Sequence, residues 1–264
     1  MDFEIRDRVA LVCGGSSGLG YAVAEALFAE GAHIALNGRD PGKLDGAVRR
    51  LGASAPAGRV AGFPADVSKP GAATALVERV HHEMGGPDIL LCNAGGPPAG
   101  PVESHAPETW QQALEVSLLS TIHLSLAALP HMRVAGWGRI LCLASVAARQ
   151  PSAALILSTT ARAGVLGFAK ALADEVAAEG ITVNVLCPGY FGTERLTELA
   201  ATRGKAQGRS PAEMLADMGQ AVPARRIGTP AEFAAAAAFL ASGPARYITG
   251  TVLSVDGGLT RSIL

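Results

Sequence analysis

Seven short apolar runs alternate with longer segments of helical periodicity along this chain. Strands that alternate with helices pair in parallel and are joined by right-handed crossovers. Runs that are apolar at nearly every position are typical of sheets covered on both faces. We therefore predict a doubly wound α/β fold with one parallel sheet, whose strands cover residues 9–13, 33–37, 60–63, 89–92, 140–144, 182–187 and 251–255.

The predicted helices fill the intervals between these strands. A further helix begins at Thr229, because Thr is a good N-cap, Pro230 suits the first turn and Glu232 completes a capping box. Residues 193–228 are irregular, and we expect them to form a substrate loop within one domain spanning residues 1–264. The other helices cover residues 19–30, 43–51, 69–84, 108–135 (shortened or bent near Pro130) and 153–179.

Composition and charge exclude several classes of protein. Of the 264 residues, 49% are hydrophobic and 17% are charged, so the chain can bury a large core and carries too little charge for disorder. The net charge is −1 and no block of Lys or Arg stands out, so we expect no nucleic-acid partner. No apolar run approaches the roughly 18 residues of a membrane span, and the N-terminus lacks a signal-peptide pattern, so we expect no membrane partner.

The cysteines give no sign of a metal site. Cys13, Cys92, Cys142 and Cys187 include no Cys-x-x-Cys pair, so their spacing favours neither a zinc site nor a disulfide framework. Small buried hydrophobes are the simpler interpretation of Cys13 and Cys92. Free cysteines fit a reducing compartment, and we expect the protein in the cytoplasm.

A glycine-rich turn joins the first strand to the first helix. Its residues are Gly14, Gly15, Ser16, Ser17, Gly18, Leu19 and Gly20. Glycine lets a backbone turn tightly and approach a ligand closely, and the helix that follows offers free N–H groups to a pyrophosphate. A tight turn without any ligand is the alternative, and the spacing differs from the common G-x-G-x-x-G pattern.

Three further motifs follow later strands in the expected order: Asn93-Ala94-Gly95, Pro188-Gly189 and Asp256-Gly257-Gly258. Together with the glycine turn, they make the chain resemble the short-chain dehydrogenase/reductase family over nearly its whole length. The resemblance implies a single Rossmann-type domain, a nicotinamide cofactor and a homotetramer. Cofactor binding at the carboxyl ends of the strands also agrees with the general rule for open α/β sheets.

The resemblance also implies which residues hold the cofactor. Asp66 and Val67 would lie by the adenine, Asn93 and Gly95 would line the cleft, and Pro188 and Thr193 would contact the nicotinamide end. Turn formation is the alternative role for Asp66 and Asn93. The remaining contacts would come from the glycine turn, through Gly14, Ser16, Ser17, Gly18, Leu19 and Gly20.

The end of the second strand favours NADP(H) over NAD(H). Members that use NAD carry an acidic residue there, which takes the ribose hydroxyls. Here that position is Gly38, followed by Arg39, and no carboxylate occurs before Asp40. A guanidinium can hold a 2′-phosphate that a carboxylate would repel. An ordinary solvated surface arginine is the alternative interpretation of Arg39.

The catalytic positions depart from the family pattern. Members carry Asn for a water chain, Ser to orient the carbonyl, Tyr to exchange the proton, and Lys to hold the ribose and lower the Tyr pKa. No Tyr in this chain is followed by Lys four residues later, so the resemblance implies an atypical member. The matching positions hold Ser117, Ser145, Ser158 and Arg162.

This change removes the usual proton donor and keeps a cation. Ser158 and Arg162 lie one helical turn apart, so they share a face of the helix. An alkyl hydroxyl is a much weaker acid than a phenol, whereas a guanidinium can still hold a ribose or polarise an oxygen through two N–H groups. Tyr190, His105 or water held by Ser145 and Ser158 are candidate proton sources.

We therefore predict an atypical short-chain oxidoreductase that transfers hydride between NADP(H) and a carbonyl or alcohol of a small, rather apolar substrate. Two alternatives stay open. The scaffold can serve a lyase or isomerase without net redox chemistry, or a nucleotide-binding protein without turnover. For the pair itself, the alternative interpretation is a plain helix residue at position 158 and a salt-bridged or snorkelling arginine at position 162.

Overall fold

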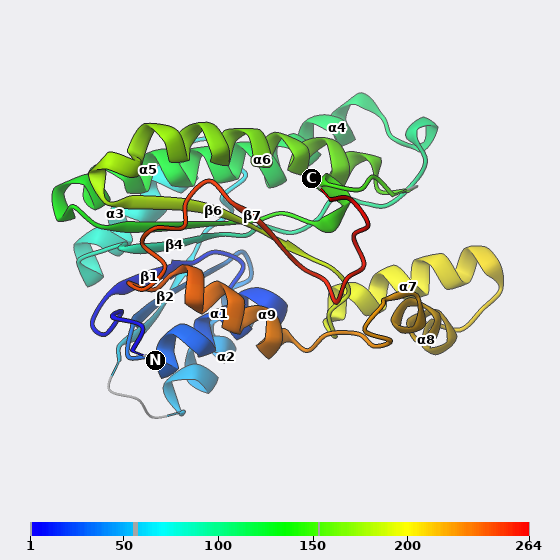
Figure 1. Cartoon of the computed structure of the whole chain (residues 1–264), viewed down its shortest axis with the longest axis horizontal. Helices are drawn as coiled ribbons and strands as arrows, with labels where there is room; N and C mark the ends of the chain where they lie inside the picture. The colour runs from blue at the N-terminus through cyan, green and yellow to red at the C-terminus, as the bar shows by residue number, and fades with distance from the viewer. Residues whose placement is uncertain (1, 55–57, 153, 264) are drawn as a thin grey trace.

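The computed structural model describes residues 2–54, 58–152 and 154–263. Seven strands form one sheet, all parallel, in the order β3-β2-β1-β4-β5-β6-β7 (Figure 1). The predicted doubly wound sheet is confirmed, with strand ends that differ by one or two residues. The strands are β1 (Val9–Val12), β2 (His33–Gly38), β3 (Val60–Pro64), β4 (Ile89–Cys92), β5 (Gly138–Leu143), β6 (Ile181–Pro188) and β7 (Val252–Val255).

Helices cover both faces of the sheet (Figure 1). One face carries α1 (Gly18–Ala29), α2 (Pro41–Gly52) and α9 (Pro230–Leu240). The other carries α3 (Ala72–Met84), α5 (Ser120–Ala135) and α6 (Ile156–Val176). Successive strand residues point to opposite faces, so Leu11 and Val12 belong to two different core clusters. This burial on both sides explains the nearly continuous apolar strands.

The helical segment before β5 is interrupted at a different place than expected. α4 (Pro107–Leu114) passes through a π-helical turn, Glu115–Leu119, into α5, which continues past Pro130 to Ala135. The helix is therefore not shortened at Pro130. Leu126 and Pro130 lie on its exposed side, where water can solvate the carbonyl that loses its partner.

Among the described residues, one helical segment has the length and composition of a membrane-crossing helix, Pro107–Ala135. It contains no continuous apolar run of that length, since polar residues such as His123 and Arg133 interrupt it. α5 packs against α3, β4 and β5, and these contacts account for its apolar side.

The segment expected to be an irregular loop is largely helical. It contains α7 (Glu194–Gln207) and α8 (Pro211–Ala221), which extend from the carboxyl ends of the strands (Figure 1). Ser210 caps α8 in a capping box with Glu213, and Met214 and Met218 pack against Leu196 in a small separate core. Ser210 carries the same Ser/Thr-Pro-x-Glu pattern as Thr229, so the sequence holds a signal for the start of α8.

Candidate active site

A cleft of about 930 Å³ opens at the carboxyl ends of the strands. It lies where β1 and β4 adjoin and the strand order reverses, which is the general place for ligands in open α/β sheets. Its size is near the upper end of the range for ligand pockets, roughly 300–1,000 Å³. Its wall includes every predicted cofactor residue except Gly20: Gly14, Ser16, Ser17, Gly18, Leu19, Arg39, Asp66, Val67, Asn93, Gly95, Pro188 and Thr193.

The glycine turn depends on conformations and space that only glycine provides. Gly14 and Gly18 have φ of +61° and +58°, in the left-handed region. A Cβ on Gly14 would lie 2.6 Å from Nδ2 of Asn93, which donates a 3.5 Å hydrogen bond to the Gly14 carbonyl. A Cβ on Gly20 would lie 2.3 Å from the same carbonyl, so Gly20 acts by letting α1 pack against the turn.

The N-terminus of α1 fits a pyrophosphate. Ser17 is its N-cap but makes no side-chain cap, so the first N–H groups of the helix are not satisfied by that hydroxyl. Ser16, Ser17 and Leu19 lie on the cleft wall around these groups. Free N–H groups and the positive end of the helix dipole suit a doubly charged phosphate group.

Arg39 lies on the cleft wall at the end of β2. The space for a Cβ on Gly95 is 3.9 Å from its Nη2, so the guanidinium extends across the cleft towards the end of β4. It is exposed and has no hydrogen bond or ion pair with any described residue. An unpaired guanidinium at this position fits a phosphate on the adenosine ribose.

Asp66 lies in the cleft, as predicted, and it also forms a turn, the alternative role. Its Oδ1 accepts hydrogen bonds from the Ser68 N–H at 3.1 Å and the Ser68 hydroxyl at 2.7 Å. Burial raises the pKa of the Asp66 carboxyl, but the Ser68 hydrogen bonds and the charge of Arg39 outweigh it and leave the pKa below its ordinary value. Asp66 is therefore charged at neutral pH and holds the turn that shapes the cleft.

Ser145, Ser158 and Arg162 all belong to the wall of the cleft. Ser145 follows β5, and its Oγ accepts a 3.1 Å hydrogen bond from the Ala147 N–H. The Ser145 hydroxyl hydrogen is then free to be donated into the cleft. Ser158 is half-buried in the first turn of α6, and its hydroxyl makes no hydrogen bond with a described residue.

Arg162 is buried beneath this wall, 9% exposed. Its Nη1 donates to the carbonyls of Leu143, at 3.0 Å, and of Ala144, so it ties α6 to the end of β5. Its Nε is buried without a hydrogen-bond partner among the described residues. Burial lowers the pKa of Arg162 to about 10, so the guanidinium remains charged at neutral pH.

Ser117 is not brought to the cleft wall. It lies in the π-helical turn, where its neighbour Val116 lines the cleft instead. The Ser117 Oγ is buried and has no hydrogen-bond partner among the described residues, while its carbonyl accepts from the Thr121 hydroxyl at 3.2 Å. Its predicted part in a water chain stays a prediction.

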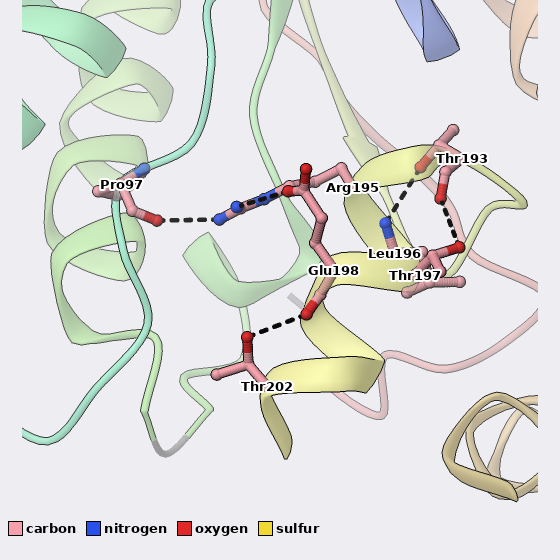
Figure 2. A network of polar contacts seen from close by, with 7 residues as sticks. All are labelled: Pro97, Thr193, Arg195, Leu196, Thr197, Glu198 and Thr202. Atoms are coloured by element: carbon pink, nitrogen blue, oxygen red, sulfur yellow. Dashed lines mark hydrogen bonds and ion pairs between the residues drawn. The ribbon is translucent and has the colours of Figure 1, made fainter. Parts of the chain in front are cut away.

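Beyond Thr193, the α7 side of the cleft holds residues that were not among the predicted site residues. Arg195 reaches from α7 to the loop after β4, where its Nη2 donates to the Pro97 carbonyl at 2.9 Å (Figure 2). Its Nη1 lies 3.5 Å from Glu198, and Thr193 caps the helix through the Leu196 N–H. The spacing of Leu196, Leu199 and Arg203 places them on one face of α7. Predicting a helix over these residues would therefore have indicated this part of the cleft wall.

The model of the enoyl-(acyl carrier protein) reductase family matches residues 14–260. D-β-hydroxybutyrate dehydrogenase of Cupriavidus necator is 33% identical over 258 residues, which cover 96% of this chain and 98% of that protein. The 3-oxoacyl-(acyl-carrier-protein) reductase of Escherichia coli is 36% identical over 259 residues, which cover 98% and 99%. The chain belongs to the short-chain dehydrogenase/reductase family.

Among solved structures, L-sorbose reductase of Gluconobacter frateurii in complex with NADPH and L-sorbose matches with a TM-score of 0.94. It is 34% identical, and the match covers 100% of both chains. This agreement confirms the Rossmann-type fold of a short-chain dehydrogenase/reductase and the oxidoreductase character of its relatives.

Proposed function

We propose that this chain is an NADP(H)-dependent oxidoreductase that transfers hydride between the cofactor and a carbonyl or alcohol group of a small substrate. Membership of an oxidoreductase family supports the reaction class. Ser145, Ser158 and Arg162 lie on the cleft wall that also carries Pro188 and Thr193, expected at the nicotinamide end. The reacting groups and the cofactor site therefore share one cleft.

The choice of NADP(H) rests on Arg39. It is the cleft guanidinium nearest the end of β2, and no described residue pairs with it. NADPH is also the cofactor in the L-sorbose reductase complex. The α1 N-terminus would hold the pyrophosphate, while Asp66 and Val67 would border the adenine.

Three side chains would bind the reacting oxygen of the substrate, stabilise its charge and supply its proton. The nicotinamide, when bound, supplies or accepts the hydride. The Ser145 hydroxyl, which already accepts from Ala147, would donate to the oxygen of the substrate. Arg162 would stabilise negative charge on that oxygen, because a buried cation acts strongly in a water-poor site. Ser158 would hold the water that provides the proton.

This function depends on the observation that Ser145, Ser158 and Arg162 line the same cleft as the predicted cofactor residues. Calorimetry with NADPH and NADH tests the binding half of the proposal. A panel of carbonyl and alcohol substrates, followed by absorbance at the nicotinamide band, tests the chemical half. We expect NADPH to bind more tightly and at least one carbonyl to be reduced.

One observation favours a second candidate. Nη1 of Arg162 already donates to the carbonyls of Leu143 and Ala144. Two hydrogen bonds from Arg162 to a substrate oxygen would therefore have to come from Nε and Nη2. A lyase or isomerase, or a nucleotide-binding protein without turnover, depends less on a pair of hydrogen bonds from Arg162 to a substrate oxygen. Turnover without net cofactor oxidation would indicate the first of these, and cofactor binding without turnover would indicate the second.

We also propose a homotetramer. β7 is an edge strand with Leu253 exposed, and α5 exposes Leu126 and Val134. Apolar side chains on an edge strand and a helix face suit contacts between copies of the chain. Light scattering at micromolar concentration checks this assembly, and a monomer there would contradict it.

A further inference from the structure

The guanidinium of Arg203 lines the cleft but has no role in the proposed reaction or in the proposed cofactor binding. Arg203 lies in the third turn of α7 and lines the cleft, and it is half-buried. It makes no hydrogen bond or ion pair with any described residue. A long charged side chain that is partly withdrawn from water without a partner calls for an explanation.

The other cleft arginines differ from Arg203. Arg162 is held by two backbone carbonyls, and Arg195 is held by Pro97 and Glu198. Arg39 is unpaired too, but it lies at the end of β2, where the adenosine end of the cofactor is expected. Arg203 is thus the unpaired cation on the α7 side of the cleft.

The position of Arg203 suits the far end of a substrate. It follows Arg195 by eight residues, about 12 Å along the helix axis. Leu199 precedes it on the same face of α7, and Leu155 lies on the cleft wall as well; both leucines are half-buried. An apolar stretch followed by a cation is the surface that a short carbon chain ending in an anion would match.

The acidic residues of the cleft do not neutralise Arg203. Glu198 lies beside Arg195 at 3.5 Å, and Glu194, in the first turn of α7, is about 13 Å away along the axis. Asp66 is at the end of the cleft expected to hold the adenine and is satisfied by Ser68. No described acid therefore competes with a ligand for this guanidinium.

We propose that Arg203 binds an anionic group, a carboxylate or a phosphate ester, at the end of the substrate remote from the reacting carbon. This names the substrate class and rests on the proposed oxidoreductase function for the reaction, while the anion site itself can be tested by binding. A guanidinium holds either anion through paired N–H groups. Arg203 would thereby select charged substrates over neutral ones of the same length.

The test compares matched pairs of carbonyl compounds with the cofactor-loaded protein. Oxo acids of four to seven carbons are paired with their methyl esters, and dihydroxyacetone phosphate is paired with dihydroxyacetone. Binding is measured by calorimetry with the NADP⁺-loaded protein, and reduction by absorbance at the nicotinamide band. The variants are Arg203→Gln and Arg203→Lys, with Lys205→Gln as a matched control, since Lys205 is exposed on the same helix outside the cleft.

We expect one anionic series to bind about ten- to a hundredfold more tightly than its neutral partners, as a charge-assisted hydrogen bond allows. Arg203→Gln should abolish this preference, Arg203→Lys should keep part of it, and Lys205→Gln should keep all of it. The series that shows the preference identifies the anion as a carboxylate or a phosphate.

Equal affinity for charged and neutral partners in the parent protein would overturn the proposal, as would a preference that survives Arg203→Gln. Arg203-dependent binding of the anion without any NADPH oxidation would support this site and contradict the proposed reaction instead. Melting temperatures of the variants show that a loss of binding is not a loss of folding.

Discussion

At the cofactor end of the cleft, the part proposed to bind NADP(H), the main chain forms much of the surface. At the reaction end, the part proposed to hold the substrate carbonyl, a few side chains form it. The cofactor end uses left-handed glycines, a helix N-terminus without a side-chain cap, and a turn held by Asp66. The reaction end depends on the hydroxyls of Ser145 and Ser158 and on the buried charge of Arg162.

This difference explains where the family pattern persists and where it changes. A left-handed φ and a 2.6 Å approach leave glycine almost no substitute at position 14. On α6, the half-buried Ser158 and the buried Arg162 occupy the positions where the family resemblance implies a phenol and an ammonium. Dinucleotide binding should therefore be the robust property of this protein, and chemistry the adjustable one.

The largest effect should come from Arg162→Lys. Lys keeps the charge but cannot donate to the carbonyls of Leu143 and Ala144 while also presenting N–H groups to a substrate. We expect turnover to fall about 10²- to 10³-fold, the usual cost of losing a donor to a reacting oxygen. Steady-state kinetics measure it, with Arg149→Lys as a control outside the cleft. Unchanged turnover would show that Arg162 has a structural role alone.

A smaller effect, confined to the cofactor end, should follow Arg39→Ala. The variant removes the guanidinium that faces the expected 2′-phosphate, so the preference for NADPH over NADH should shrink about ten- to a hundredfold. Calorimetry with both cofactors measures it, and Arg49→Ala removes a charge from α2 outside the cleft as a control. A parent protein that binds both cofactors equally would refute the assignment.

Arg195→Ala should have a milder effect, on the rate at which NADPH dissociates from the cleft. The variant loses the hydrogen bond by which α7 is joined to the Pro97 carbonyl in the loop after β4 (Figure 2). We expect NADPH to dissociate about two- to tenfold faster, since a single hydrogen bond has this modest value. Stopped-flow fluorescence of bound NADPH measures the rate, and Lys205→Ala serves as a control. An unchanged rate would mean that α7 does not hold the cofactor in place.

The smallest effect should be the response of the parent protein to pH. Serine hydroxyls do not titrate near neutrality, and Arg162, with a pKa lowered to about 10 by burial, stays protonated below that value. Turnover at saturating substrate should therefore vary less than about twofold between pH 6 and 9 and should fall only as pH approaches 10. A clear transition near pH 7 would reveal another titrating group at the reaction end.

Much of the fold was predictable because each strand and most helices carry local signals. Apolar runs marked all seven strands, and Thr229 marked the start of α9. The helices α7 and α8 were missed although Ser210 carries the same capping signal as Thr229. Their apolar face is short, because Met214 and Met218 pack in a small core away from the sheet, so helical periodicity there is weak.

The site was predictable where backbone geometry governs it and less so where side chains choose among partners. Glycine spacing located the turn, and the family resemblance placed Asp66 and Asn93 in the cleft that they line. No local pattern shows that Arg162 would donate to the carbonyls of β5, or that Ser117 would lie behind Val116 in a π-helical turn. Those outcomes depend on contacts between segments far apart in the chain.

The most direct test compares carbonyl reduction by the parent protein and by the double variant Ser158→Tyr/Arg162→Lys. Both are given NADPH and the same carbonyl panel, with absorbance at the nicotinamide band as the readout. We predict that the parent reduces at least one carbonyl and that the double variant loses this activity, because the reaction end is built around Ser158 and Arg162. A double variant that gains a reduction which the parent lacks would contradict the account, and would assign the parent to binding or to a different reaction.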